Sequence, residues 1–218
     1  MRCRMSVWAL IAIPFAAVAA VSPAHAQGVP SPGNATVPAS IRLVGLDAFG
    51  VPDPAGLFTV VLRDLANNPV PNAIIRVELL PCSGASLCPL QGPTITAVNC
   101  NAGGLWVEGL TDVNGVWSAA IVGCAKGNPV VSPFGCARIY GKGVLLNSPR
   151  VAIADLGGCD GLGSNDLGLW LGDFYTGLDF QRSDYDGNGL PGANDLSLWL
   201  TEWGSARSVV NCGGTACP

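Results

Sequence analysis

The chain has 218 residues, of which 49 % are hydrophobic and 12 % are charged, and its formal net charge is −4. The apolar content is high enough for a packed core, which excludes a disordered chain, and the slightly acidic balance argues against nucleic-acid binding. The 29 glycines and 17 prolines indicate many turns, but the glycines have no period of three, which excludes a collagen-like chain.

Residues 1–26 have the pattern of a secretory signal peptide. Two arginines precede an apolar stretch from residue 7 to residue 21, and Ala24-His25-Ala26 forms a small-x-small cleavage site before Gln27. A membrane anchor is the alternative, but the stretch is short and contains Pro14. We therefore expect an exported protein, secreted or at the cell surface. No later segment is apolar for long enough to span a membrane.

Cleavage before Gln27 would remove the only histidine and one of the nine cysteines. A mature chain without histidine has no Ser-His-Asp triad, no Cys-His pair and no histidine ligand for zinc. An even number of cysteines in an exported chain indicates disulfides. The eight candidates are Cys82, Cys88, Cys100, Cys124, Cys136, Cys159, Cys212 and Cys217.

The acidic residues divide the mature sequence into two regions. Residues 27–154 carry six acidic and seven basic side chains, whereas residues 155–218 carry nine acidic and two basic ones. This asymmetry predicts two domains with different roles. Five of the eight cysteines precede residue 155, so complete pairing requires a bridge between the two regions. Cys159, nearest the boundary, is the expected crossing residue, and one free thiol in each region is the alternative.

The first region has the pattern of short β-strands separated by turns. Residues 27–39 are small, polar and proline-rich, and we expect a flexible leader there. The expected strands cover residues 57–62, 73–79, 105–110, 116–121, 137–140, 144–147 and 151–154. Asn114-Gly115 predicts a hairpin between two of them, across which Trp106 and Trp117 face each other. We interpret these tryptophans as cross-strand packing, with a sugar-stacking platform as the alternative. Many short, regularly spaced strands favour an all-β sandwich over residues 40–154.

Two segments of this region, RDLANNPVPNAIIRVEL and GLTDVNGVWSAAIVG, resemble bacterial immunoglobulin-like repeats of surface and secreted proteins. The resemblance covers residues 40–154. It implies an immunoglobulin-like β-sandwich and implies no activity.

The second region contains an internal duplication. Residues 155–174 align with residues 184–203 without a gap, and nine of the twenty positions are identical, including NDL and LWL in each copy. Each copy reads as a loop followed by a helix, and we name the loops loop 1 (residues 155–166) and loop 2 (residues 184–195). Apolar residues at i, i+3, i+4 and i+7 form one stripe on each predicted helix. The stripes are Leu167, Trp170, Leu171 and Phe174, and Leu196, Trp199, Leu200 and Trp203, and we expect them to face each other.

Loop 2 has the spacing of a calcium-binding loop. Oxygen-bearing side chains fall at loop positions 1, 3, 5 and 12, glycine falls at position 6, and the position 7 carbonyl supplies a further oxygen. The predicted Ca²⁺ ligands are Asp184, Asp186, Asn188, the Leu190 carbonyl and Asp195. An Asx-rich turn with a helix N-cap is the alternative without metal.

Loop 1 has lost part of this pattern. Asp155 and Asp166 keep positions 1 and 12, whereas Gly157 and Cys159 occupy positions 3 and 5 and Asp160 replaces the glycine. Two interpretations stay open. Loop 1 binds calcium weakly through shifted ligands, or a disulfide at Cys159 holds it.

Two calcium loops, each followed by a short helix, resemble type I dockerin domains. The residues that match the dockerin motif are Asp184, Asp186, Asn188 and Asp195. The resemblance covers residues 155–206 and leaves a cysteine-containing tail at residues 207–218. It implies docking to a cohesin-type protein domain, in assemblies that often degrade polysaccharides. Pro191, where a β-branched residue is usual, and the incomplete loop 1 depart from the family pattern.

The sequence thus predicts a mixed fold: an immunoglobulin-like sandwich followed by a small helical calcium module. The leading function is non-catalytic, adhesion or assembly in the presence of Ca²⁺, with no catalytic residue assigned. One alternative is a purely structural surface protein held by calcium and disulfides. Another is a polysaccharide-active enzyme using carboxylates among Glu78, Glu108 and Glu202, although a sandwich of this size leaves little room for a cleft.

Overall fold

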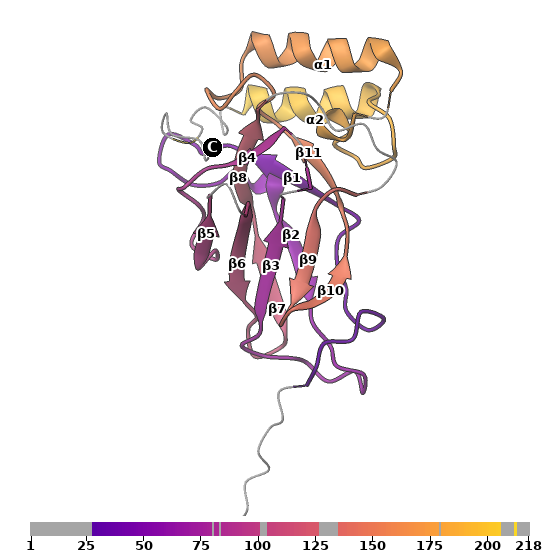
Figure 1. Ribbon diagram of the computed structural model, residues 1–218. Helices are drawn as coiled ribbons and strands as arrows, with labels where there is room; N and C mark the ends of the chain where they lie inside the picture. Colours follow the sequence, from indigo (N-terminus) through magenta and orange to yellow (C-terminus); the bar gives the residue numbers. More distant parts are fainter. Residues whose placement is uncertain are drawn as a thin grey trace, which may run out of the picture.

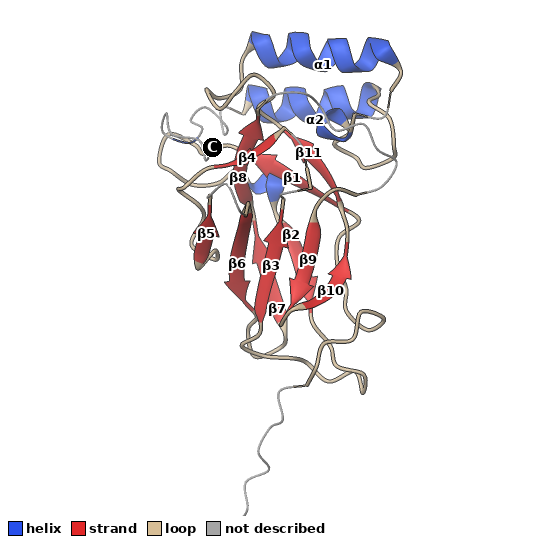
Figure 2. Cartoon of the chain, in the orientation of Figure 1, coloured by secondary structure: helices blue, strands red, loops and turns tan. Residues whose placement is uncertain are grey.

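The computed structural model describes residues 28–79, 81–82, 84–100, 104–126, 135–178, 180–205 and 212. The signal peptide expected at residues 1–26 lies outside the described residues, as does most of the C-terminal tail, including Cys217. The described part is mostly β-sheet, with two short α-helices near its C-terminal end (Figure 1, Figure 2). None of its helices combines the length and the apolar character that crossing a bilayer requires.

Three sheets make up the β region, which we define as residues 28–154. The first sheet consists, in spatial order, of β10 (Val144–Asn147), β9 (Arg138–Gly141), β3 (Ile74–Glu78), β6 (Trp106–Leu110) and β5 (Ala97–Asn99). The second consists of β11 (Arg150–Ile153), β1 (Ser40–Val44), β8 (Ile121–Ala125) and β4 (Ala85–Leu87). The third pairs β2 (Phe58–Val61) with β7 (Val116–Ala119). A short 3-10 helix, η1 (Pro54–Gly56), precedes β2.

Alternation along the strands separates a core face from a solvent face. In β3, Ile75 and Val77 are buried, whereas Ile74 is exposed. The core joins the five-stranded sheet to the β2–β7 pair through Trp117, whose indole lies against Gly109 of β6 and donates a 2.9 Å hydrogen bond to the Thr94 carbonyl. A side chain at Gly109 would overlap the indole, so this glycine permits the close approach of the two sheets.

The Asn114-Gly115 turn forms, but the flanking strands belong to different sheets. Gly115 has φ +74°, and the Asp112 carboxylate accepts 2.8 Å hydrogen bonds from the N–H groups of Asn114 and Val116. However, β6 pairs with β3 and β5, whereas β7 pairs with β2. The predicted hairpin is therefore wrong, because the turn carries the chain from one sheet to the other. Trp106 and Trp117 accordingly do not face each other across it.

Residues 28–39 lie along the β region, unlike the flexible leader that we expected. Thr36 and Val61 exchange two backbone hydrogen bonds of 2.9 and 2.8 Å, and Pro30 forms an isolated bridge with Asp64. The Asn34 amide also donates to the Asp64 carbonyl at 2.8 Å. Prolines remove backbone donors and prevent a regular strand here, but they leave room for these isolated bridges.

The remaining described residues up to 205 form the repeat region, with α1 (Ser164–Thr176), the 3-10 helix η2 (Gln181–Ser183) and α2 (Ala193–Gly204). This region lies on the end of the β region near β1, β8 and β11, and α2 lies between α1 and the strands (Figure 1). One apolar core cluster runs from the β region into the repeat region, where it includes Trp170, Tyr185 and Trp199. Loop 1 follows β11 directly, and the Ala125 N–H of β8 donates to the Asp155 carbonyl at 2.7 Å. The two regions therefore pack as one body.

Candidate metal centre

Loop 2 brings three of its predicted ligands together. One carboxylate oxygen each from Asp184, Asp186 and Asp195 lies within 4.8 Å of the other two. Asp184 and Asp195 are buried, whereas Asp186 is exposed. The Asn188 side chain stands beside them, with its amide donating to Asp186 at 2.8 Å. An acidic cluster of this size, open on one side, has the hard oxygen donors that Ca²⁺ prefers.

The loop is shaped by its glycines and by its own carboxylates. Gly187 and Gly189 have φ +74° and +113°, conformations that disfavour a side chain. The Asp184 carboxylate accepts 3.0 Å hydrogen bonds from the N–H groups of Asn188 and Gly189, which curls the backbone around it. These bonds orient the position 1 carboxylate toward the centre of the loop.

Asp195 joins the loop to helix α2. Its two oxygens accept hydrogen bonds from the N–H of Asp186 at 2.9 Å and of Gly192, the N-cap residue, at 2.7 Å. Burial raises the pKa of Asp195, and the nearby Asp186 charge raises it further, while the backbone hydrogen bonds oppose the shift. A bound cation would remove the repulsion between these carboxylates and fix the first turn of the helix.

Arg150 of β11 also belongs to this centre, although the sequence did not predict it there. Its Nε and Nη2 atoms lie 3.1 and 2.9 Å from Oδ2 of Asp184, and the arginine and aspartate side chains are only 13 % and 0 % exposed. The three carboxylates and this guanidinium sum to −2, which matches one divalent cation. Nothing in the loop pattern points to Arg150, because it lies 34 residues before Asp184 and the fold alone brings the two together.

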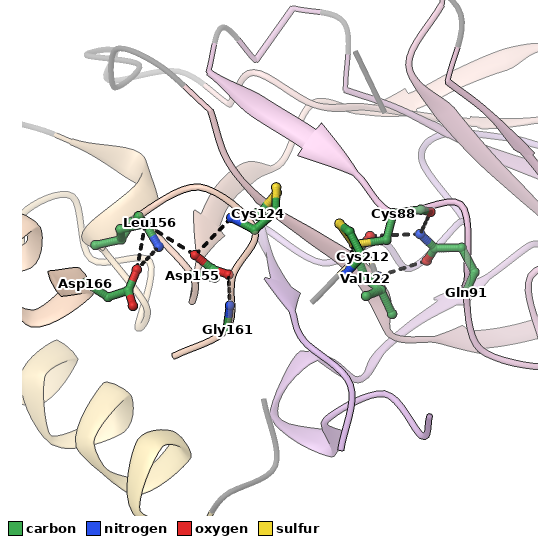
Figure 3. The surroundings of a disulfide bond; sticks show 11 residues. Cys88, Gln91, Val122, Cys124, Asp155, Leu156, Gly161, Asp166 and Cys212 are labelled. Atoms are coloured by element: carbon green, nitrogen blue, oxygen red, sulfur yellow. Dashed lines mark hydrogen bonds between the residues drawn. A yellow bond between two sulfur atoms is a disulfide. The ribbon is translucent and has the colours of Figure 1, made fainter. Parts of the chain in front are cut away.

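Loop 1 has a different construction (Figure 3). Its Asp155 and Asp166 are buried but Asp160 is exposed, so only two of the three predicted carboxylates face the loop interior. Cys159, at the position equivalent to Asn188, forms a disulfide with Cys124 of β8. Among the two interpretations left open above, the geometry therefore favours a loop held by a disulfide.

The two inner carboxylates of loop 1 bind backbone groups. Asp166 accepts from the N–H groups of Leu156 (2.7 Å), Gly157 (2.6 Å) and Gly163 (2.7 Å). Asp155 accepts from Gly161 at 2.8 Å, also visible in Figure 3. Burial raises the pKa of Asp166 to about 6, and the Asp155 charge adds to this, against the effect of the backbone hydrogen bonds.

The two repeats interlock through their tryptophans. The Trp170 indole of the first repeat donates to the Ser183 carbonyl at 3.1 Å, and the Trp199 indole of the second donates to the Ala154 carbonyl at 3.0 Å. Each acceptor immediately precedes position 1 of the other repeat's loop. The predicted apolar stripes are thus only partly core, because both tryptophans are buried whereas Phe174, Leu200 and Trp203 are 42, 41 and 39 % exposed.

Each repeat also ends in a buried carboxylate that binds an arginine. Asp173 pairs with Arg182 through two hydrogen bonds of 2.7 and 2.9 Å and accepts a third from the Ser183 hydroxyl. Its counterpart Glu202 lies 3.4 Å from Arg42 of β1. The first pair is internal to the repeat region, while the second fastens that region to the β region.

Disulfides connect the regions as the cysteine count requires. Cys82 pairs with Cys136 inside the β region, whereas Cys124–Cys159 and Cys88–Cys212 cross the boundary, and Cys100 is disulfide-bonded as well. The sulfurs of Cys124, Cys159 and Cys212 lie within 4.8 Å of one another. Because disulfide sulfurs lack the thiolate charge that a metal ligand needs, we assign no metal to this group.

Comparison with known proteins gives no matching family model, no matching curated protein and no matching solved structure. The assignment of a function therefore depends on the geometry of the two loops and of the surfaces around them.

Proposed function

We propose that loop 2 binds Ca²⁺ and that the protein is a non-catalytic, exported assembly module whose C-terminal part is ordered by this ion. The observation that carries the proposal is the convergence of Asp184, Asp186 and Asp195 within 4.8 Å at the start of α2. Asn188 and the Leu190 carbonyl would complete a set of oxygen ligands, in the order that calcium loops use. Mg²⁺ demands a stricter octahedral geometry, so a flexible, carboxylate-rich loop suits Ca²⁺ better.

The direct test is calorimetric titration of the purified protein with CaCl₂. We expect one binding event that is lost in Asp184→Ala/Asp195→Ala and retained in Asp155→Ala/Asp166→Ala. Asp186→Asn is a milder variant, because Asp186 is exposed and its side chain contacts only loop 2. It should weaken binding without unfolding the protein. Absence of binding at millimolar calcium, or loss of the tighter event in the loop 1 variant, would refute the assignment.

The finer fold assignment belongs to the same proposal. A β region of three sheets followed by two loop–helix units is consistent with an immunoglobulin-like sandwich and a dockerin-like module. The exposed apolar side chains on the two helices and just after α1 support a docking role. They are Phe174, Tyr175, Leu178, Leu198, Leu200 and Trp203, which are 38–79 % exposed. A cohesin-type protein domain is the proposed partner class.

Docking is tested by calcium-dependent binding to a panel of recombinant cohesin domains. Leu178→Ala/Leu200→Ala should reduce binding, since each side chain is about half exposed and its removal leaves the core intact. A matched control, Leu65→Ala, removes an apolar side chain that is 86 % exposed in the β region and should leave binding unchanged. Failure to bind any member of the panel would favour the structural alternative below.

A purely structural role is the second candidate, and one observation favours it. The repeat region is fastened to the β region by the Cys124–Cys159 disulfide and by the Arg42–Glu202 and Arg150–Asp184 ion pairs. A module that must reach an external partner has less need of such attachment. The enzyme alternative has less support, because Glu202 is 3 % exposed and pairs with Arg42, which separates it from Glu78 and Glu108.

A further inference from the structure

The outer face of the five-stranded sheet carries a polar and aromatic groove that the calcium module does not use. Strand register places Glu108 and Tyr140 on either side of Arg76, and Trp106 and Arg138 on either side of Glu78. The alternate residues of these strands, such as Val77, Val107 and Ile139, point into the core and are fully buried. The side chains of Arg76, Glu78 and their cross-strand neighbours therefore face away from the core. No described helix crosses this side of the sheet in Figure 2.

This face is hollowed rather than flat. A groove of about 410 Å³ is lined by Ile74, Arg76, Glu78, Glu108, Tyr140, Lys142 and Gly143. Sites for small ligands usually have volumes of about 300 to 1,000 Å³, so the groove is large enough for a small ligand or for a short stretch of a longer polymer.

Arg76 is fixed at the centre of the groove. Its Nη2 and Nε atoms lie 2.6 and 2.7 Å from Oε1 of Glu108, and its guanidinium carbon lies 4.4 Å above the centroid of the Trp106 ring. Its side chain is nevertheless 41 % exposed. A guanidinium held on two sides keeps its remaining N–H donors in a set direction, which favours bidentate recognition of neighbouring hydroxyl groups.

The charges of the lining identify the ligand class. Among the lining residues, Arg76 and Lys142 balance Glu78 and Glu108, while the neighbouring Arg138 adds one positive charge to the face, so the lining itself exerts no strong long-range attraction on an anion or a cation. Tyr140 is half-buried and supplies flat apolar surface with a polar edge, whereas the ring of Trp106 beside the groove is covered on one face by the Arg76 guanidinium. Planar donors, carboxylate acceptors and aromatic rings at zero net charge suit a ligand with many neutral hydroxyls and an apolar ring face.

We propose that this groove binds a neutral polysaccharide. Sugar hydroxyls would pair with Arg76 and Glu78, and the C–H face of a sugar ring would pack on Tyr140. The sugar-stacking platform considered from the sequence combined Trp106 with Trp117, but Trp117 is 3 % exposed and belongs to the β2–β7 pair. The site lies on the side of the β region, separate from loop 2, so binding does not depend on the proposed calcium site.

The test is affinity gel electrophoresis of the full-length protein in gels that contain a neutral polysaccharide. The polymers are uncharged cellulose derivatives, xylan, mixed-linkage β-glucan, galactomannan and starch. Alginate and polygalacturonate serve as anionic controls. We expect retardation by at least one neutral polymer, unchanged in 0.5 M NaCl, because a neutral ligand releases no counterions. The retardation should be the same in calcium and in EDTA, so this test is independent of calcium binding by loop 2.

Two variants locate the binding. Tyr140→Ala and Glu78→Gln should each weaken retardation by about tenfold in dissociation constant, the effect of removing one well-placed polar or packing contact. Glu78→Gln keeps the shape of the side chain and removes only its charge, so it guards against unfolding of the alanine variant. Thr59→Ala, on the exposed face of β2, is the matched control and should bind as the parent does.

The proposal is overturned if no neutral polymer retards the protein, if only anionic polymers do so and salt abolishes the effect, or if both groove variants are retarded as strongly as the parent. Binding of a protein or peptide at this face, without any polysaccharide binding, would also overturn it.

Discussion

The two loops of the repeat region have similar sequences and are held by different chemistry. In loop 1 the position 5 residue is Cys159, which is bonded to Cys124 of the β region, and only two carboxylates, Asp155 and Asp166, are buried in the loop. In loop 2 the position 5 residue is Asn188, and three carboxylates converge beside Arg150. Changes at positions 3, 5 and 6 thus separate a loop that is fixed covalently from one that is suited to a cation.

The largest effect should come from the covalent bond of loop 1. Replacing Cys124 and Cys159 with alanine removes a bridge that spans 35 residues, which chain entropy predicts to cost about 4 kcal/mol of unfolding free energy. Denaturant unfolding in EDTA measures this loss. Calcium affinity of loop 2 should stay unchanged in this variant. A large loss of affinity would mean that the two loops do not act independently.

Calcium should stabilise the protein through loop 2 alone. At a calcium concentration about one hundred times the dissociation constant, binding to the folded state adds about 2.7 kcal/mol to the free energy of unfolding. Asp186→Asn should lose most of this gain, and Asp155→Asn, its loop 1 control, should keep it. Unfolding curves with and without calcium provide the measurement. An equal loss in both variants would contradict the contrast between the loops.

The pH response of loop 1 should follow Asp166. Asp166 has a folded-state pKa of about 6, above the ordinary value of 3.8, so its contribution to stability is complete below pH 3.8 and is lost as the pH rises through 6. The loss amounts to at most about 3 kcal/mol.

Carbon-13 NMR titration of the aspartate carboxyls checks this assignment. Calcium should leave the pKa of Asp166 in place but lower that of Asp195, because a bound cation favours its charged form. A calcium-induced drop at Asp166 would show that loop 1 binds the ion as well.

The smallest effects concern the interlocking tryptophans. Trp170→Phe and Trp199→Phe each remove one indole hydrogen bond and leave a buried carbonyl unpaired, which costs about 1–3 kcal/mol. Because the two bonds occupy equivalent places, the two variants should be destabilised equally in urea. If Trp199→Phe has a much lower free energy of unfolding than Trp170→Phe, the contact of α2 with the β region contributes more than the contact of α1 with the second repeat.

Local pattern predicted much of this molecule, and long-range contacts account for what it missed. Short β-type runs between turn clusters located β3 and β6, and the duplication located both helices, since these signals act over a few residues. The cysteine count required a crossing bridge. Arg150 at loop 2 was missed, because only the position of β11 beside the loop brings it there.

The turn between β6 and β7 shows the same limit. Asn114-Gly115 specifies a tight change of direction, and the position of the turn was predicted correctly from the sequence. Whether the next strand pairs with the last one or crosses to another sheet is decided by partners far away in the chain, such as β2. The exchange of tryptophans between repeats is likewise a property of the folded pair, and neither repeat alone reveals it.

Strand β1 imposes an order on folding. Leu43 lies between Ile121 of β8 and Ile153 of β11, and both pairings are parallel. Both partners of β1 lie much later in the chain. Contacts of such long sequence separation form slowly. β1 gains its first partner once β8 has been made and its second only when β11 has been made. Synthesis from the N-terminus would therefore complete the β region before the repeat region, and the Cys88–Cys212 disulfide can close only after loop 2 has been made.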